Sequence, residues 1–344
     1  MNPGQQDRGA PRVQANVPAN PSVITRPDAG VGLIGDIGAT NARFLLVRTD
    51  GTTTAPRVYA LTDFASLADA INAYLTEEAP PVRPVRSVLA IASPVTGDQV
   101  TMTNHPWTFS IEAVRQQFGL TRLLVVNDFA ADAAAIPYLG EKDRIQIGGG
   151  APVKEAPIGV IGPGSGLGVG ALVPSANGAL TISGEGGHVT MTPATAHESA
   201  ILDLMRKRYD HVSAERLLSG PGLINLYNTR CELAGTPAAS YTADQITSPS
   251  IWKKDPRTRE ATSIFCAMLG TVAGNLALTL GARGGIYIAG GIVPRIATFF
   301  AQSEFRARFE AKGRMRGYLA AIPTYLIVRP LPGLLGAAAL LSEC

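Results

Sequence analysis

The chain has 344 residues, enough for two domains of ordinary size. Hydrophobic residues make up 46% of it and charged residues 17%, and the net charge at pH 7 is only +3, so neither nucleic acid nor an anionic membrane is an expected partner. The three cysteines form no C-x-x-C pair, and no unbroken apolar run reaches the roughly 20 residues of a membrane span. This composition argues against a disulfide framework and a structural zinc site, and it favours a cytoplasmic protein.

The first segment with a structural pattern follows a long tail. Residues 1–30 are rich in Pro, Gly, Ala, Asn and Gln without apolar periodicity, which predicts a disordered tail. The stretch Gly32–Val47 then joins two apolar runs through a glycine-rich turn and predicts a β-hairpin. Such a turn can cradle a phosphate with its N–H groups while Asp36 faces a divalent cation, although an ordinary hairpin with a polar tip is the alternative.

Strands and helices alternate over the next hundred residues. We expect strands at 57–60, 85–92, 100–102 and 123–126, and helices at 67–75, 111–118 and 130–136. This order predicts a parallel or mixed sheet covered by helices, with the chemistry at the carboxyl ends of the strands. Asn127 and Asp128 follow the last of these strands. Asp128 is the best candidate for a general base, although the two residues could simply cap the next helix.

A second glycine-rich unit begins near the middle of the chain. Apolar runs at 158–161 and 169–173 flank the segment Gly162–Gly168, whose spacing loosely fits a dinucleotide-binding motif. That motif requires a helix after its glycines, whereas Pro174 and the turn at Asn177-Gly178 indicate further strands. The unit therefore resembles the first hairpin, and the two together suggest a duplicated core.

The second half is predicted to be largely helical. We expect helices at 197–209, from 213, at 221–233, 263–280, 296–309 and 334–341, and strands at 286–289 and 325–328. Residues 235–258 form a polar stretch whose structure the pattern leaves open, with one short helix as an option. The glycines after the strand at 286–289 would let a planar base lie close to the backbone.

Several polar side chains are candidates for binding a small ligand rich in hydroxyl groups. Glu185 and His188 lie in a glycine-rich loop, and Glu215 lies in the first turn of the helix expected from residue 213. Metal binding by Glu185 and His188 is the weaker alternative, because no further His or Cys ligand has suitable spacing. Asn104 and Trp107 could face the substrate, although a tryptophan is more often part of the core.

The chain lacks the P-loop pattern G-x-x-x-x-G-K-[ST] and the protein-kinase motifs, so a nucleotide would be held by the glycine turns. In order, GDIGATNAR, ASPVTG, TNHPWTFS, NDF, GPGSGLG, GEGGH, SAERLLSGPGL and GGIYIAGGIVPR resemble the motifs of bacterial glucokinases of the hexokinase/actin-like ATPase superfamily, from about Gly32 to the C-terminus. The resemblance implies a two-domain α/β fold, actin-like (ribonuclease H-like), with a central cleft. A small domain of residues 31–138 plus 332–344 and a large domain of residues 139–331 are expected.

The same resemblance implies the reaction and the residues that carry it. The reaction is phosphorylation of glucose at its 6-hydroxyl by ATP with Mg²⁺, in a protein that could form a homodimer. Asp128 is the implied general base. The residues implied to bind sugar are Asn127, Asp128, Glu185, His188 and Glu215.

The resemblance also implies which residues contact ATP and magnesium. The first phosphate loop is Gly35, Asp36, Ile37, Gly38, Ala39 and Thr40, with Asp36 toward magnesium through water. The second is Gly164, Ser165 and Gly166, and the adenosine motif is Gly290 and Gly291. Two positions depart from the family pattern: Ala39 replaces a usual glycine and is expected to disfavour a backbone with φ > 0, and Ser165 replaces a common threonine.

Two alternatives to a glucokinase remain at this point. A kinase for another hexose or an amino sugar fits the same polar residues. A sugar-sensing repressor of the superfamily would need an N-terminal helix-turn-helix, and the Pro-rich tail contains no such helix or basic face.

Overall fold

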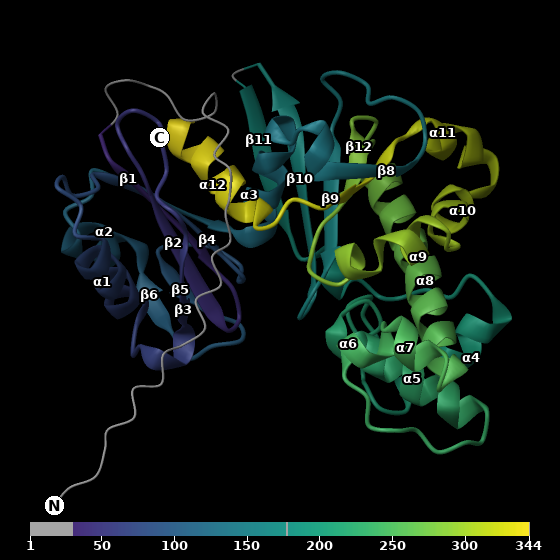
Figure 1. The fold of residues 1–344 in the computed structure, drawn as a ribbon. Coiled ribbons are helices and arrows are strands. Elements are labelled where there is room, and N and C mark those ends of the chain that lie inside the picture. The colour runs from purple at the N-terminus through teal and green to yellow at the C-terminus, as the bar shows by residue number, and fades with distance from the viewer. Residues whose placement is uncertain (1–29, 177, 344) are drawn as a thin grey trace, which may run out of the picture.

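The fold was analysed in a computed structural model that describes residues 30–176 and 178–343. The tail predicted over residues 1–30, apart from Gly30, and Asn177 of the predicted turn therefore lie outside the described residues. Within them, the strands form a five-stranded sheet, a six-stranded sheet and a two-stranded ribbon. Figure 1 shows the two large sheets side by side, with α3 (Asp128–Ala135) and α12 (Pro332–Glu343) between them. The predicted mixed α/β class is confirmed.

The five-stranded sheet begins with the predicted hairpin. Its strand order is β3-β2-β1-β4-β7, in which β1, β2 and β3 are antiparallel neighbours and β4 and β7 run parallel to β1. The strands are β1 (Gly32–Ile37), β2 (Asn41–Val47), β3 (Arg57–Ala60), β4 (Arg86–Ile91) and β7 (Arg122–Asn127). Ile37, Ile91 and Asn127 lie in one row across the three parallel strands, so the segments that follow them meet at one edge of the sheet.

Alternation along β1 places different residues on the two faces of this sheet. Leu33 and Ile37 pack in the core that includes α1 (Leu67–Glu78), which begins at its Ser66 cap as the spacing predicted. Ile34 packs on the opposite face, against α12. Asp36 has the same parity as Ile34, so its carboxylate lies on the side of the sheet that α12 covers.

The six-stranded sheet repeats this topology. Its order is β11-β10-β9-β12-β13-β8: β9, β10 and β11 are antiparallel neighbours, β12 and β13 run parallel to β9, and β8 pairs antiparallel with β13. The strands are β8 (Arg144–Gly148), β9 (Ile158–Pro163), β10 (Leu167–Ser175), β11 (Gly178–Gly184), β12 (Gly285–Ile288) and β13 (Thr324–Ile327). The predicted duplicated core is confirmed, whereas β8 was not predicted.

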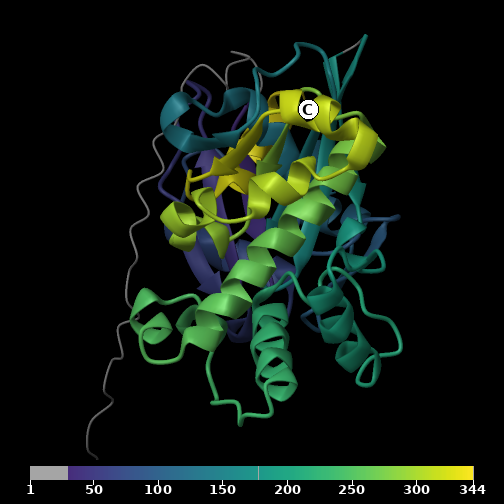
Figure 2. The ribbon, with the colours of Figure 1, turned by 90° about the vertical axis from the view of Figure 1, so that its right-hand side faces the viewer.

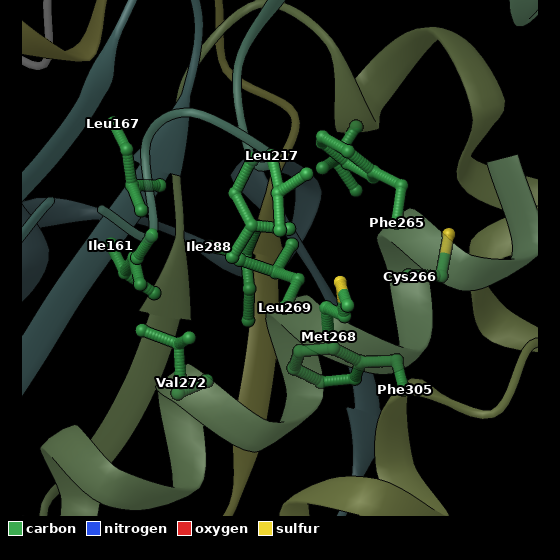
Figure 3. Packing of buried hydrophobic residues seen from close by; sticks show 14 of the residues in the cluster. Ile161, Leu167, Leu217, Phe265, Cys266, Met268, Leu269, Val272, Ile288 and Phe305 are labelled. Carbon is green, nitrogen blue, oxygen red and sulfur yellow. The ribbon is translucent and has the colours of Figure 1, made fainter. Parts of the chain in front are cut away.

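The longest helix of the described chain, α8 (Pro256–Leu280), packs on this sheet. Figure 3 shows Leu269 and Val272 of α8 near Ile161 of β9 and Ile288 of β12, and all four side chains belong to one buried cluster. The helix is long and apolar enough to cross a membrane by length and composition alone, but 61% of the relevant window is buried within the protein. That burial is what the core helix of a globular protein shows.

The remaining helices surround α8 or cover the first sheet. Figure 2 shows α8 running obliquely, with the helices of residues 196–252 gathered around one of its ends. The helices and the two strands of the ribbon are α2 (Ile111–Gln117), α4 (Ala196–Arg206), α5 (Gly220–Leu233), α6 (Ala243–Ile246), α7 (Pro249–Trp252), α9 (Ala297–Ala301), α10 (Phe305–Glu310), α11 (Arg316–Ala321), β5 (Gln99–Thr101) and β6 (Thr108–Ser110).

Two helix predictions were wrong, each for a local reason. The segment from Ser213 forms turns, and helix α5 begins only after Ser219, whose hydroxyl caps it by accepting a hydrogen bond from Gly222 N–H. The helix predicted over 296–309 is divided into α9 and α10. The division lies at Ser303, whose hydroxyl donates to the carbonyl of Phe300 and accepts from the N–H of Phe305.

Candidate active site

A cavity of about 850 Å³ opens where the carboxyl ends of the parallel strands of both sheets meet. From the first sheet it is lined by residues that follow β4 and β7, and by Asp36 within β1. From the second sheet it is lined by residues that follow β9, β12 and β13, and by the polar side chains near β11. A cleft at paired strand ends is where open α/β sheets bind ligands.

Asp128 reaches this cavity from the first residue of α3. The side chain of Asn127 caps the helix, because its Oδ1 accepts a hydrogen bond from Phe129 N–H at 2.9 Å, and Oδ1 of Asp128 lies 3.0 Å from the same nitrogen. The Asn127 amide also donates to the carbonyl of Ser93 at 3.4 Å. The capping role considered from the sequence is therefore real. It also holds the Asp128 carboxylate at the cavity wall.

The electrostatic environment of Asp128 favours its protonated form more than water would. Burial, followed by the nearby charge of Asp36, raises the pKa of Asp128 to about 7. Burial also raises the pKa of Asp36, although Arg43 forms an ion pair with it at 3.3 Å. Burial and the charge of Asp128 raise the pKa of Asp132 well above its usual value. Three carboxyl groups with raised pKa values thus face one cavity.

The polar side chains predicted to grip hydroxyl groups also line the cavity. Glu185 and His188 belong to a short loop after β11, in which His188 Nε2 lies 3.8 Å from Glu185 Oε2. We call residues Glu185–His188 the sugar loop, after the ligand that the sequence predicts for it. Their side chains are 54% and 59% exposed, so both are open to a ligand. The backbone N–H of Glu215 donates to the Gly187 carbonyl at 2.9 Å, which places Glu215 beside this loop.

The glycines predicted to contact the phosphoryl donor line the same cavity. The second glycine turn (Gly164–Gly166) and the pair Gly290-Gly291 all line the cavity. A Cβ added at Gly164 or at Gly291 would meet no atom within 4 Å, so a ligand can approach the backbone there. Gly290 has φ +80°, and a Cβ there would overlap the Pro163 carbonyl, so glycine is required for the two strand ends to pack.

Only one residue of the first predicted phosphate loop lines the cavity, and that residue is Asp36. Ile37 is buried in the core, and a Cβ on Gly35 would lie 2.7 Å from Leu89, so both contribute to packing. Residues Gly38, Ala39 and Thr40 form the tip of the hairpin and are absent from the cavity lining. Contact of these six residues with phosphate or its magnesium ion stays a prediction.

The conflict expected at Ala39 does not arise in this structure. The described non-glycine residues with positive φ are Ala79, Glu155 and Leu331, and Gly38 also has an ordinary φ. The tip of the first hairpin therefore places no steric demand for glycine at position 39.

The cavity wall also contains side chains that the sequence did not single out. They include Arg43, Ser93, Thr103, Phe129 and Asp132. Arg43 lies opposite Asp36 in the hairpin register, and Asp132 lies one helical turn after Asp128, so register and i,i+4 spacing could have found both. Asn104 lines the cavity, whereas Trp107 is 3% exposed and donates to the Phe64 carbonyl, as a core tryptophan does.

The side chains of the cavity offer few protein ligands for a metal ion. Among the described residues, no group of three or more His, Cys, Asp or Glu side chains is placed to hold a metal ion, which leaves Glu185 and His188 without a third protein ligand. Asp36 fits an Mg²⁺ ion that takes most of its ligands from phosphates and water, because Mg²⁺ sites usually use one or two carboxylates.

Solved structures with the same fold define the class of protein. A glucokinase from an Antarctic psychrotroph has a TM-score of 0.82 and 36% sequence identity, and the match covers 91% of this chain and 99% of that chain. A ROK family glucokinase from Streptomyces griseus in complex with glucose and AMPPNP is 18% identical, with a TM-score of 0.63 and coverage of 92% and 100%, and shares the fold. The fold is that of sugar kinases with the actin-like ATPase fold, as predicted.

Sequence comparison then narrows the class to one family. A family model described as Glucokinase matches residues 33–344. The glucokinase of Paramagnetospirillum magneticum is 52% identical over 312 residues, which cover 90% of this chain and 97% of that relative. The chain belongs to the glucokinase family. The predicted resemblance, and with it the prediction of an enzyme, is confirmed.

Proposed function

We propose that the protein transfers the γ-phosphoryl group of ATP to the 6-hydroxyl of glucose. The observation that carries the proposal is the position of Asp128, a partly buried carboxylate in a cavity that polar side chains and open glycine turns also line. Phosphoryl transfer needs little covalent participation from protein. It needs an acceptor hydroxyl, a base for its proton and a phosphate held in line.

Asp128 is the proposed general base. Its ionised carboxylate accepts the proton of the 6-hydroxyl while that oxygen forms a bond to the γ-phosphorus and the bond to the β,γ-bridging oxygen breaks, leaving ADP. A base is most effective when its pKa lies near the working pH, and burial raises the pKa of Asp128 to about 7. The cap formed by Asn127 holds the carboxylate in place without a covalent role.

Asn127, Glu185, His188 and Glu215 are the proposed sugar ligands. Together they offer carboxylate acceptors, an amide and an imidazole that can donate or accept, which suits a ligand with several hydroxyl groups. Their common position on the cavity wall supports the assignment.

On the donor side, Asp36 is proposed to hold Mg²⁺ through water, and the ion would neutralise charge on the phosphate oxygens. The open backbone at Gly164 and Gly291 supports a role for the two glycine segments in holding the triphosphate and the adenosine. Ser165 adds a hydroxyl to the second glycine turn. The first hairpin is proposed to contribute the N–H groups of its tip once the cleft closes.

The division into a small domain (31–138 plus 332–344) and a large domain (139–331) is likewise proposed. Its support is that α12 packs on the first sheet, with Leu334 and Leu341 against Ile34, although α12 ends the chain. Closure of the two parts over glucose would exclude water, so that the phosphoryl group goes to the sugar. A cytoplasmic location and a homodimer also stay predictions, and light scattering of the purified protein measures the second.

Coupled assays test the proposed function: ADP formation is followed for each sugar with ATP, and glucose 6-phosphate formation is followed for glucose with each donor. Glucose, mannose, fructose, galactose and glucosamine are offered with ATP, and glucose is then offered with ADP or polyphosphate. We expect the highest kcat/KM for glucose with ATP and Mg²⁺. A higher value for another hexose or for glucosamine would reassign the substrate. No turnover of any sugar, together with a shift of DNA in a gel, would favour a sugar-sensing regulator instead.

A further inference from the structure

Glu215 lies between the sugar loop and the second glycine turn and contacts both. Its backbone N–H donates to the Gly187 carbonyl at 2.9 Å, inside the sugar loop. Its carboxylate oxygen Oε2 accepts a hydrogen bond from Leu167 N–H at 2.8 Å, directly after the second glycine turn. One residue is thus bonded to the proposed sugar site through its backbone and to the proposed donor site through its side chain.

The position of the Glu215 carboxylate explains why residue 166 is a glycine. A Cβ added at Gly166 would overlap Oε2 of Glu215, so any larger residue would push the carboxylate away. A Cβ added at Gly164, in contrast, would meet no atom within 4 Å. The two glycines of the turn therefore have different reasons: Gly164 leaves the cavity open, whereas Gly166 admits the Glu215 carboxylate.

The segment that follows Glu215 makes a second hydrogen-bonded connection to the same turn. The N–H of Gly220 donates to the Gly164 carbonyl at 2.8 Å, and the turn is closed by Gly164 N–H donating to the Gly166 carbonyl at 2.8 Å. Ser219, which caps α5, donates its hydroxyl to the Glu215 carbonyl at 2.8 Å. Residues 215–220 thus form a continuous bonded connection between the sugar loop and the second glycine turn.

We propose that Glu215 is a positioning residue for the donor phosphates as well as a sugar ligand, so that it couples the two substrate sites. Oε2 orients the second glycine turn, and Oε1, for which the described chain provides no hydrogen-bond donor, accepts from a sugar hydroxyl. A sugar bound to Oε1 then restrains the carboxylate that holds the turn. The inference rests on the proposed function and extends it to the donor site. If Glu215 bound only sugar, replacing it would leave the affinity for nucleotide unchanged.

Binding of ATP without sugar distinguishes this role from sugar binding alone. Calorimetry with Mg²⁺ and a non-hydrolysable ATP analogue, and no sugar, is compared for the wild type, Glu215→Ala, Glu215→Gln and Glu185→Gln. We expect Glu215→Ala to raise the Kd for the nucleotide at least about tenfold, which corresponds to a loss of roughly 1.4 kcal/mol of binding free energy. Glu215→Gln keeps an oxygen that can accept from Leu167 N–H, so its nucleotide affinity should stay within about threefold.

Glu185→Gln is the matched control because Glu185 is also a proposed sugar ligand but, within the described chain, forms no hydrogen bond to the second glycine turn. It should raise the KM for glucose and leave nucleotide affinity unchanged. Gly166→Ala should raise the KM for glucose although it lies in the donor turn, because it displaces the Glu215 carboxylate. Equal nucleotide affinity of Glu215→Ala and wild type would overturn the coupling.

The two proposals fail in different ways. If the wild type binds the ATP analogue but phosphorylates no sugar, the proposed function fails. If the wild type is active and a correctly folded Glu215→Ala variant, verified by circular dichroism, binds the analogue as well as wild type, only the coupling fails.

Discussion

The ring of Phe129 lies against the backbone of Gly168, so closely that a Cβ on Gly168 would overlap the ring. The contact joins α3 of the first sheet to β10 of the second. Gly162 and Gly170 also lie against Phe129. A Cβ on Gly162 would lie 2.8 Å from the Phe129 ring, and a Cβ on Gly170 would lie 2.6 Å from the Phe129 carbonyl oxygen. Glycines that resemble a nucleotide motif therefore place the residue after Asp128 against the second sheet.

Gly168→Ala should consequently impair both turnover and stability. The added methyl group must move the Phe129 ring and with it the adjacent Asp128, and overpacking of this kind typically costs about 1–3 kcal/mol. We expect kcat to fall at least about tenfold. Steady-state kinetics and urea unfolding measure the two effects. Gly317→Ala, where a Cβ meets no atom within 4 Å, is the control: its kcat should match the wild type, and its stability should not fall, because alanine is favoured over glycine within α11.

Asp128→Asn should abolish most turnover while leaving the sugar site intact. Asparagine retains an oxygen that can accept from Phe129 N–H, so the start of α3 is preserved, but it cannot take a proton. General-base catalysis contributes about 10²- to 10⁴-fold, and kcat should fall by that much while glucose affinity stays within about tenfold. Pre-steady-state kinetics and calorimetry with glucose separate the two. A variant with most of the wild-type kcat would remove Asp128 from this role.

The pH dependence of activity follows from the same carboxyl group. Because the base must be ionised, kcat/KM should rise with pH through about 7, where burial and the charge of Asp36 place the pKa of Asp128. The charge of Glu185 also raises this pKa, so Glu185→Gln should move the midpoint to lower pH. Initial rates over roughly pH 5.5 to 8.5 measure both profiles. A flat wild-type profile, or a midpoint that rises in the variant, would contradict the assignment.

Asp132 offers a prediction about stability rather than rate. Its pKa is raised in the folded state by burial and by the charge of Asp128, so the stability linked to its proton is present below the unfolded pKa of about 4 and lost as pH rises through the folded pKa. Asp132→Asn cannot ionise. The variant should therefore melt at a higher temperature than wild type at pH 8, with a difference that shrinks toward pH 4.

Thermal melts of the ligand-free protein across that range measure the effect of Asp132. Asp63→Asn removes an exposed carboxylate that does not line the cavity and is the matched control. A wild type that is more stable than Asp132→Asn at pH 8 would show that the ionised Asp132 carboxylate has a favourable partner instead.

Much of this arrangement could be predicted from local patterns. Short apolar runs predicted the strands of both sheets except β8, and the polar residues after them pointed to Asp128 because strand ends share one edge. Glu185, His188 and Glu215 were found because their residue types suit hydroxyl groups. All four line one cavity, although Glu215 was assigned to a helix that the structure does not contain.

What the sequence could not show depends on contacts between distant segments. The turns at residues 213–219 form because Ala214 and Glu215 donate their N–H groups to Val189 and Gly187, and no local pattern encodes those partners. The reasons for Gly166 and Gly168 are likewise the Glu215 carboxylate and the Phe129 ring, which approach from far along the chain. A glycine pattern indicates close approach without naming what approaches.

Ala39→Gly tests whether the first hairpin needs glycine at its tip. Because Ala39 does not adopt a positive φ, the substitution relieves no strain in this conformation, and the KM for ATP should stay within about twofold of wild type. The variant should also lose about 0.4–1 kcal/mol of stability, since glycine adds freedom to the unfolded chain. Kinetics with varied ATP and urea unfolding measure the two quantities. A KM for ATP that falls severalfold would mean that the tip takes up a left-handed conformation when it meets the phosphates.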